Sequence, residues 1–193
     1  MSNLAYLDLS YEIINGKAYM MSPTNLRHSE ICTNICLIFK NYLKGKTCKV
    51  FQDAWVHLDK NIIAPDLSIV CNRSIIRNNV IFGAPDLVVE VSSPSSTEKD
   101  NTFKKTLYER HGVKEYWIVS DGSIEVFILE NNVYASSGVY HYDYTEYEML
   151  EYLPTEKQAE IISKSKFKTS IFDLTINLVD IFGDKSDNIH LNP

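Results

Sequence analysis

Hydrophobic positions recur with a helical period in two parts of the chain. One face of a helix over about 25–44 carries apolar residues at i, i+4, i+7 and i+11, namely Ile31, Ile35, Ile38 and Tyr42. Thr24-Asn25 can cap its start, and Gly45 with its flanking lysines suits its end. A second helix is predicted for about 97–111, ended by Gly112.

The other hydrophobic segments are short and rich in β-formers, which is typical of strands. A hairpin is expected around Asn15-Gly16, and another joins 115–120 to 123–130 around Asp121-Gly122. Residues 86–92 are almost continuously apolar, as in a strand covered on both faces. Further strands are expected at 48–58, 62–71, 133–141, 146–152 and 159–163, followed by an apolar segment at 171–182. This order of elements predicts an α/β fold with helices on a mixed sheet.

Composition places the chain among ordinary globular proteins. It has 193 residues, of which 45% are hydrophobic and 23% charged, and we expect a single domain over 1–193. No segment approaches 18 consecutive apolar residues, and the first 14 residues lack the basic region of a signal peptide. We therefore expect a cytoplasmic protein without a membrane segment.

The four cysteines contain no CxxC pair and lie in apolar segments, so they are interpreted as buried free thiols in a reducing compartment. Cys32 and Cys36 are spaced i, i+4 on the first helix and could form a soft-metal pair. Because no second His/Cys pair accompanies them, core thiols are the favoured interpretation.

Carboxylates interrupt the apolar strands at Asp66, Asp86 and Glu90. Alternation places Asp86, Val88 and Glu90 on one face of their strand and the intervening residues on the other. A buried carboxylate is costly unless it is paired, hydrogen-bonded or bound to a metal. Two of them on adjacent strands could hold Mg²⁺ or Mn²⁺, although a turn cap or a solvated strand end is an alternative for each one alone. Gln52 could reach the same site or be an ordinary exposed strand residue.

A longer signature extends this pattern. The segment GAPDLVVEVSSPSSTEKDNTFKKTLYERHGVKEYWIV, the upstream YEIINGKAYMMSP, His28, the Pro65-Asp66 pair and the tail FKTSIFDLTINLVDIF together resemble the Uma-two-type restriction endonuclease family. That family belongs to the PD-(D/E)XK nuclease superfamily, and the resemblance covers roughly 11–182.

The resemblance implies a restriction-endonuclease-like mixed sheet flanked by helices, here with an additional N-terminal hairpin and C-terminal strands. It also implies a divalent-metal site, Mg²⁺ or Mn²⁺, with Asp66 and Glu90 as metal ligands and catalytic residues. The superfamily lysine two residues after the second acid is Ser92 here, and Lys104 on the next helix is the matching catalytic position. Glu30 and His28 are possible additional site residues.

The implied activity is hydrolysis of phosphodiester bonds in DNA by a metal-dependent endonuclease. The chain has 25 acidic and 19 basic residues, a net charge of −6, which predicts weak, metal-dependent DNA binding. This acidity and Ser92 also motivate the alternative of a catalytically inactive nuclease-fold binding or assembly module. A homodimer is expected if the late apolar segment TINLVDIF packs against a second copy.

Overall fold

The computed structural model describes residues 11–21, 25–92 and 98–183, with only the backbone of 98–101. The predicted cap residue Thr24 lies outside the described residues. The first ten residues, for which we expect no signal peptide, lie outside them as well.

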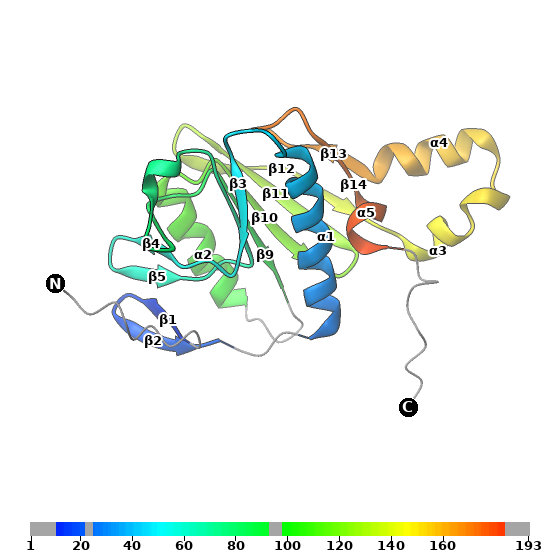
Figure 1. Ribbon diagram of the computed structural model, residues 1–193. Helices are drawn as coiled ribbons and strands as arrows, with labels where there is room; N and C mark the ends of the chain where they lie inside the picture. The colour runs from blue at the N-terminus through cyan, green and yellow to red at the C-terminus, as the bar shows by residue number, and fades with distance from the viewer. Residues whose placement is uncertain (1–10, 22–24, 93–97, 184–193) are drawn as a thin grey trace.

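A six-stranded mixed sheet forms the centre of the molecule (Figure 1). Its spatial order is β12 (Val133–His141), β11 (Ser123–Glu130), β10 (Glu115–Ser120), β9 (Leu87–Val91), β6 (Leu67–Val70) and β3 (Lys49–Gln52). Strands β9 and β10 run parallel, and the other neighbours are antiparallel. Glycine at the predicted turn after β10, Gly122, has φ +77°, as a tight hairpin of this kind requires.

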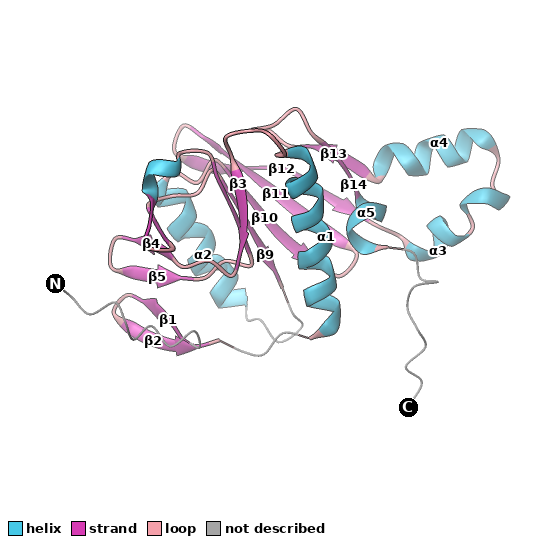
Figure 2. Ribbon diagram, in the orientation of Figure 1, coloured by secondary structure: helices cyan, strands magenta, loops and turns pink. Residues whose placement is uncertain are grey.

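A second six-stranded sheet lies beside the first and includes the N-terminal hairpin (Figure 2). Its order is β2 (Lys17–Met20), β1 (Tyr11–Ile14), β5 (Asn61–Ile63), β4 (Val56–Leu58), β8 (Val80–Phe82) and β7 (Ile76–Arg77). The hairpin joins through β1, since Ile13 pairs with Ile62 of β5. A small third sheet pairs β13 (Lys166–Lys168) with β14 (Thr175–Asn177).

Helices cover both faces of the central sheet. The described helices are α1 (Leu26–Tyr42), α2 (Glu98–His111), α3 (Tyr144–Glu148), α4 (Thr155–Lys164) and α5 (Leu178–Phe182), with 3₁₀ turns η2 (Arg73–Ile75) and η3 (Leu150–Tyr152). The α1 face of the core contains Leu87, Val89 and Val91, and the α2 face contains Val88. The predicted alternation along β9 is therefore confirmed. It places Glu90 on the α2 face, because Glu90 shares the parity of Val88.

Two predicted strands are wrong. Residues 146–152 and 159–163 belong to α3, η3 and α4, which extend beyond the sheets (Figure 1). The side chain of Asp143 caps α3 by accepting from the backbone N–H groups of Thr145 and Glu146. The predicted strands 48–58 and 62–71 also each divide into two, the first near Asp53, whose φ of 49° interrupts an extended strand.

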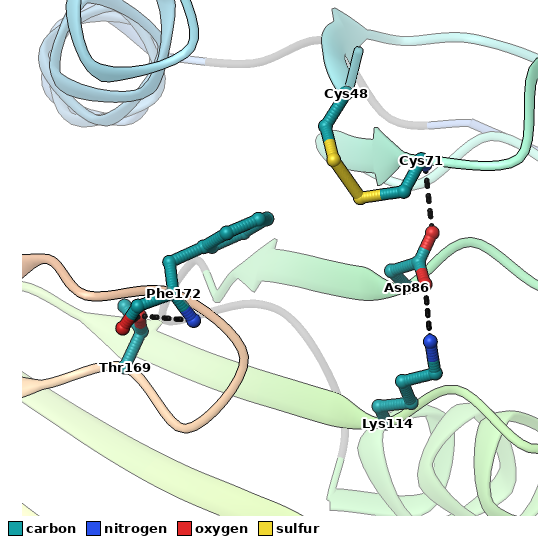
Figure 3. Close-up of a disulfide and its surroundings, with 6 residues drawn as sticks. All are labelled: Cys48, Cys71, Asp86, Lys114, Thr169 and Phe172. Atoms are coloured by element: carbon teal, nitrogen blue, oxygen red, sulfur yellow. Dashed lines mark hydrogen bonds and ion pairs between the residues drawn. A yellow bond between two sulfur atoms is a disulfide. The ribbon is translucent and has the colours of Figure 1, made fainter. Parts of the chain in front are cut away.

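The thiol prediction is right for Cys32 and Cys36 and wrong for the other two cysteines. Cys48 and Cys71 form a disulfide between the ends of β3 and β6 (Figure 3). Lys49 pairs with Val70 in the antiparallel ladder, so the register continued by one residue sets Cys48 opposite Cys71. The two residues are 23 positions apart in sequence, and only the strand pairing brings them together.

The late apolar segment is buried within the chain itself. Ile176, Leu178, Ile181 and Phe182 are each at most 1% exposed and belong to the α1 side of the core. These four residues are therefore already covered within the chain, and the homodimer stays a prediction without their support. No helix in the described part of the chain is long and apolar enough to cross a bilayer.

Candidate active site

Strand register brings two of the predicted acids together. Leu67 of β6 pairs with Val89 of β9 in an antiparallel ladder. Continued by one residue, this register sets Asp66 opposite Glu90 at the edge where β6 begins and β9 ends. Side chains directly opposite each other in a sheet lie about 5 Å apart at Cβ, and like charges there repel. The pair therefore needs a cation nearby.

Asp66 is fixed through both of its carboxylate oxygens. Oδ2 accepts from the backbone N–H of Val91 at 2.6 Å, and Oδ1 lies 3.2 Å from Nε2 of His28 on the first turn of α1. A hydrogen bond from the imidazole to the Asp66 carboxylate raises the pKa of His28, against the effect of its burial. His28 therefore holds the Asp66 carboxylate in place from the α1 side.

Glu90 is 8% exposed and hydrogen-bonded from the α2 side. Its Oε1 accepts from the Tyr108 hydroxyl at 2.5 Å and lies 3.1 Å from Lys104 Nζ, which is 3.2 Å from Oε2. Burial raises the pKa of Glu90 to about 7, although Lys104 and the Tyr108 hydrogen bond act in the opposite direction. The carboxylate is thus poised to exchange a proton near neutral pH.

Lys104 lies between two carboxylates. Besides Glu90, its Nζ contacts Oε1 of Glu12 at 3.1 Å. Burial lowers the pKa of Lys104, but the Glu90 and Glu12 carboxylates more than offset this, and its pKa lies above the usual range. Lys104 is therefore an ammonium ion at any physiological pH. The neighbouring Lys105 points elsewhere and places Nζ 3.5 Å from the centre of the Phe127 ring.

Glu12 reaches this cation from the N-terminal hairpin. It lies on β1, is 9% exposed, and its Oε1 also accepts from the backbone N–H of Ala64 at 3.0 Å. Ala64 follows β5 and comes two residues before Asp66. Glu12 thus ties the hairpin to the segment that presents Asp66 and to the helix that presents Lys104.

The other possible site residues have different partners or are exposed. Glu30 is 45% exposed at its side chain and pairs with Arg27 at 2.8 Å. Asp86 precedes β9 and accepts from Lys114 Nζ at 2.6 Å and from Cys71 N at 2.7 Å (Figure 3). It is four residues from Glu90, about 13 Å along an extended strand. Gln52 pairs with Leu67, the residue after Asp66, and its side chain is exposed at the end of β3.

Sequence reasoning missed Glu12 and Tyr108 in this region, and it considered the ligand-capable Cys32 only as a partner of Cys36. Each carried a usable signal. Glu12 is a carboxylate within an apolar strand, the same feature that marked Glu90. Tyr108 is four residues after Lys104, and Cys32 four after His28, spacings that put each pair on one helical face.

The donor set suits a hard divalent cation. Two carboxylates from adjacent strands supply oxygen ligands, which Mg²⁺ and Mn²⁺ prefer. The same edge carries a permanent cation, Lys104, that can pair with an additional anionic oxygen. Converging carboxylates of this kind can hold the divalent ion that metal-assisted hydrolysis of a phosphate ester uses.

Comparison with known proteins identifies a family and a relative that this chain resembles. The family model Uma2, described as "Putative restriction endonuclease", matches residues 3–160. The protein named "Uncharacterized protein slr1290" from Synechocystis sp. (strain ATCC 27184 / PCC 6803 / Kazusa) is 29% identical over 126 residues. The aligned region covers 63% of this chain and 66% of that protein, just under two thirds of its length.

Solved structures share the fold. The crystal structure described as "a putative nuclease belonging to DUF820 from Anabaena variabilis ATCC 29413" superposes with a TM-score of 0.65 at 18% identity, covering 89% of both chains. This likeness confirms the expected restriction-endonuclease-like α/β fold. The type IIG restriction endonuclease BpuSI matches 62% of this chain and 14% of its own at a TM-score of 0.39 and 16% identity, too low to support any conclusion.

Proposed function

The chain belongs to the Uma2 family, and we propose from its site that it is a divalent-metal-dependent endonuclease that hydrolyses phosphodiester bonds in DNA. The observation that supports this most is the convergence of Asp66, Glu90 and Lys104 at one edge of the central sheet. The family and the fold agree with a nuclease role.

Asp66 and Glu90 are the residues that would hold Mg²⁺ or Mn²⁺. A bound ion of this kind lowers the pKa of a coordinated water and polarises a phosphoryl oxygen. The protein prepares both ligands: Val91 N–H and His28 orient Asp66, and Tyr108 orients Glu90. Because Glu90 has a raised pKa, it must lose its proton before it can act as a ligand.

Lys104 is the catalytic cation in this proposal. Its raised pKa keeps it protonated, so it serves as a charge-stabilising and water-orienting group and not as a general base. Ser92, which stands at the usual lysine position, instead donates its backbone N–H to Val119 O at 2.7 Å. The ammonium group of Lys104 reaches Glu90 from α2 and can take the place of the usual lysine. This favours the enzyme over the catalytically inactive alternative.

The substrate proposal follows from charge and family. A net charge of −6 disfavours tight binding of a polyanion, so DNA contact should be weak, salt-sensitive and dependent on the metal. A metal held by the two acids would reverse the local charge and provide the attraction that the surface lacks.

The direct test is cleavage of supercoiled and linear plasmid DNA in Mg²⁺, Mn²⁺ or Ca²⁺ at low salt. Wild-type protein should nick or linearise DNA in Mg²⁺ or Mn²⁺, and Asp66→Asn, Glu90→Gln and Lys104→Gln should each reduce cleavage by about 100-fold or more, the scale for removing one preorganised electrostatic group.

Matched controls separate the site from general charge effects. Glu30→Gln and Lys105→Gln remove the same charges at positions outside the site and should retain wild-type cleavage. Urea unfolding checks that every variant folds. Absence of cleavage under all metal conditions by a folded wild-type protein would contradict the enzyme and favour the non-cleaving binding module.

A further inference from the structure

A second set of ligand atoms lies beside Asp66, on the α1 side. His28 and Cys32 are one helical turn apart on α1, and their side chains meet the Asp66 carboxylate. One imidazole nitrogen, the Cys32 sulfur and one Asp66 oxygen all lie within 4.8 Å of one another. Cys32 is 6% exposed, and the side chains of His28 and Asp66 are 11% and 15% exposed.

The three groups lie close enough together to share one tetrahedral ion, with one ligand atom of each within 4.8 Å of the others. Typical bond lengths of 2.3 Å to sulfur and about 2.0–2.1 Å to nitrogen or oxygen give edges of roughly 3.4–3.6 Å. The Cys32 sulfur is 3.6 Å from His28 Nδ1, and Asp66 Oδ1 is 3.2 Å from His28 Nε2. Because the sulfur faces Nδ1 and the carboxylate faces Nε2, an ion would bind one of these nitrogens, and the imidazole would turn to direct that nitrogen between the sulfur and the carboxylate.

We propose that His28, Cys32 and Asp66 form a binding site for a thiophilic divalent cation of the Zn²⁺ class. Sulfur and imidazole select this class over Mg²⁺, which prefers oxygen ligands alone. On binding, the Cys32 S–H bond breaks, a sulfur–metal bond forms, and the proton passes to solvent, with no change of oxidation state. Three protein ligands leave a fourth position for water.

The site is distinct from the proposed nuclease site but shares Asp66 with it. A cation held by Cys32 and His28 would take Asp66 as a ligand and so remove it from the metal position that it is proposed to share with Glu90. Zn²⁺ should therefore inhibit Mg²⁺-dependent cleavage, and this consequence rests on the proposed function. The binding itself does not rest on it, because the three ligands are assigned from their own geometry.

The chain supplies a matched control in Cys36. It is a second buried free thiol on the same helix, one turn beyond Cys32, and it is not among the ligand-capable residues grouped around Asp66. Cys32→Ser and Cys36→Ser thus each remove one buried thiol from α1, and only the first removes a proposed ligand.

The test is a titration of the full chain with Co²⁺, a spectroscopic substitute for Zn²⁺, without added thiol reductant. Wild-type protein and Cys36→Ser should bind one Co²⁺ with a near-ultraviolet thiolate-to-metal absorption band. Cys32→Ser should lose the band, and Asp66→Asn should bind at least about tenfold more weakly, a loss that even outer-shell partners produce. Far-ultraviolet circular dichroism confirms that each variant is folded.

Two results would overturn the proposal. The first is the absence of a thiolate band in folded wild-type protein, which would leave only an S–H hydrogen bond between Cys32 and His28. The second is a thiolate band that persists in Cys32→Ser. Inhibition is scored separately, as the ratio of cleavage with and without Zn²⁺ within each variant. If cleavage is absent altogether, the proposed function fails while the Co²⁺ result still decides the metal site.

Discussion

The buried tyrosine pair on the α2 side of the sheet permits a sharp test of how the site is held. Tyr108 and Tyr116 are both 0% exposed, and their ring centres are 5.1 Å apart. The Tyr108 hydroxyl donates to Glu90 Oε1 at 2.5 Å, whereas the Tyr116 hydroxyl has no hydrogen-bond partner in the described part of the chain. Replacing each tyrosine by phenylalanine removes one hydroxyl from almost the same environment.

The expected effects differ in size and direction. A hydrogen bond to a charged group contributes about 1.5–3 kcal/mol, so Tyr108→Phe should lower the free energy of unfolding by that amount. Removing a buried hydroxyl without a partner relieves a desolvation cost, so Tyr116→Phe should be neutral or slightly stabilising. Since about 1.4 kcal/mol corresponds to one pKa unit, Tyr108→Phe should also raise the pKa of Glu90 by about one unit or more.

Urea unfolding followed by tryptophan fluorescence measures the first effect, with equal m-values as the check that the unfolded states match. Mn²⁺ titration calorimetry at pH 7 measures the second, as weaker binding by Tyr108→Phe than by Tyr116→Phe. Equal destabilisation by the two variants would refute the assignment of the Tyr108 hydroxyl as a support for Glu90.

Three other predictions concern Glu90, Glu12 and the Cys48–Cys71 disulfide. Burial raises the pKa of Glu90 to about 7, so below that pH a proton competes with the metal for this carboxylate. Calorimetry should show the Mn²⁺ dissociation constant rising about tenfold for each pH unit below 7 and staying level above pH 7. A dissociation constant that does not change between pH 5.5 and 8 would contradict this prediction. Glu12→Ala leaves the Ala64 N–H without an acceptor and should lower the free energy of unfolding by about 1–3 kcal/mol in urea, whereas Glu12→Gln keeps that acceptor and should lose less. Reducing the Cys48–Cys71 disulfide, which closes a loop of 23 residues' separation, should cost about 3 kcal/mol, and an unaltered urea midpoint would exclude this contribution.

The sequence predicted best where one local pattern decides the structure. The apolar face that runs from Ile31 to Tyr42 predicted α1 within two residues at either end, and the near-continuous apolar segment 86–92 predicted β9 with the correct parity. Both patterns are set by burial against the same sheet. The strand predictions for the segments of α3 and α4 failed because tyrosines and isoleucines there favour strands. For α3, the cap provided by Asp143 was also not recognised.

The candidate site was predictable in part, because some of its residues also stand out in a local sequence pattern. Asp66 and Glu90 stand out because a carboxylate in an apolar strand demands a partner, and the family resemblance indicated Lys104. The partners of these residues come from tertiary structure: Glu12 approaches only because β1 pairs with β5, and the Cys48–Cys71 disulfide depends on the register of β3 with β6. The local periodicity of hydrophobic residues does not predict which distant strands pair.

The most direct measurement of the central claim is an anomalous difference map from a crystal soaked in Mn²⁺. The account predicts a peak between the carboxylates of Asp66 and Glu90, with Lys104 beside it, and loss of that peak in Asp66→Asn crystals. A Mn²⁺ peak absent from this edge of the sheet, or one that remains in Asp66→Asn, would contradict the assignment of these acids as the metal ligands.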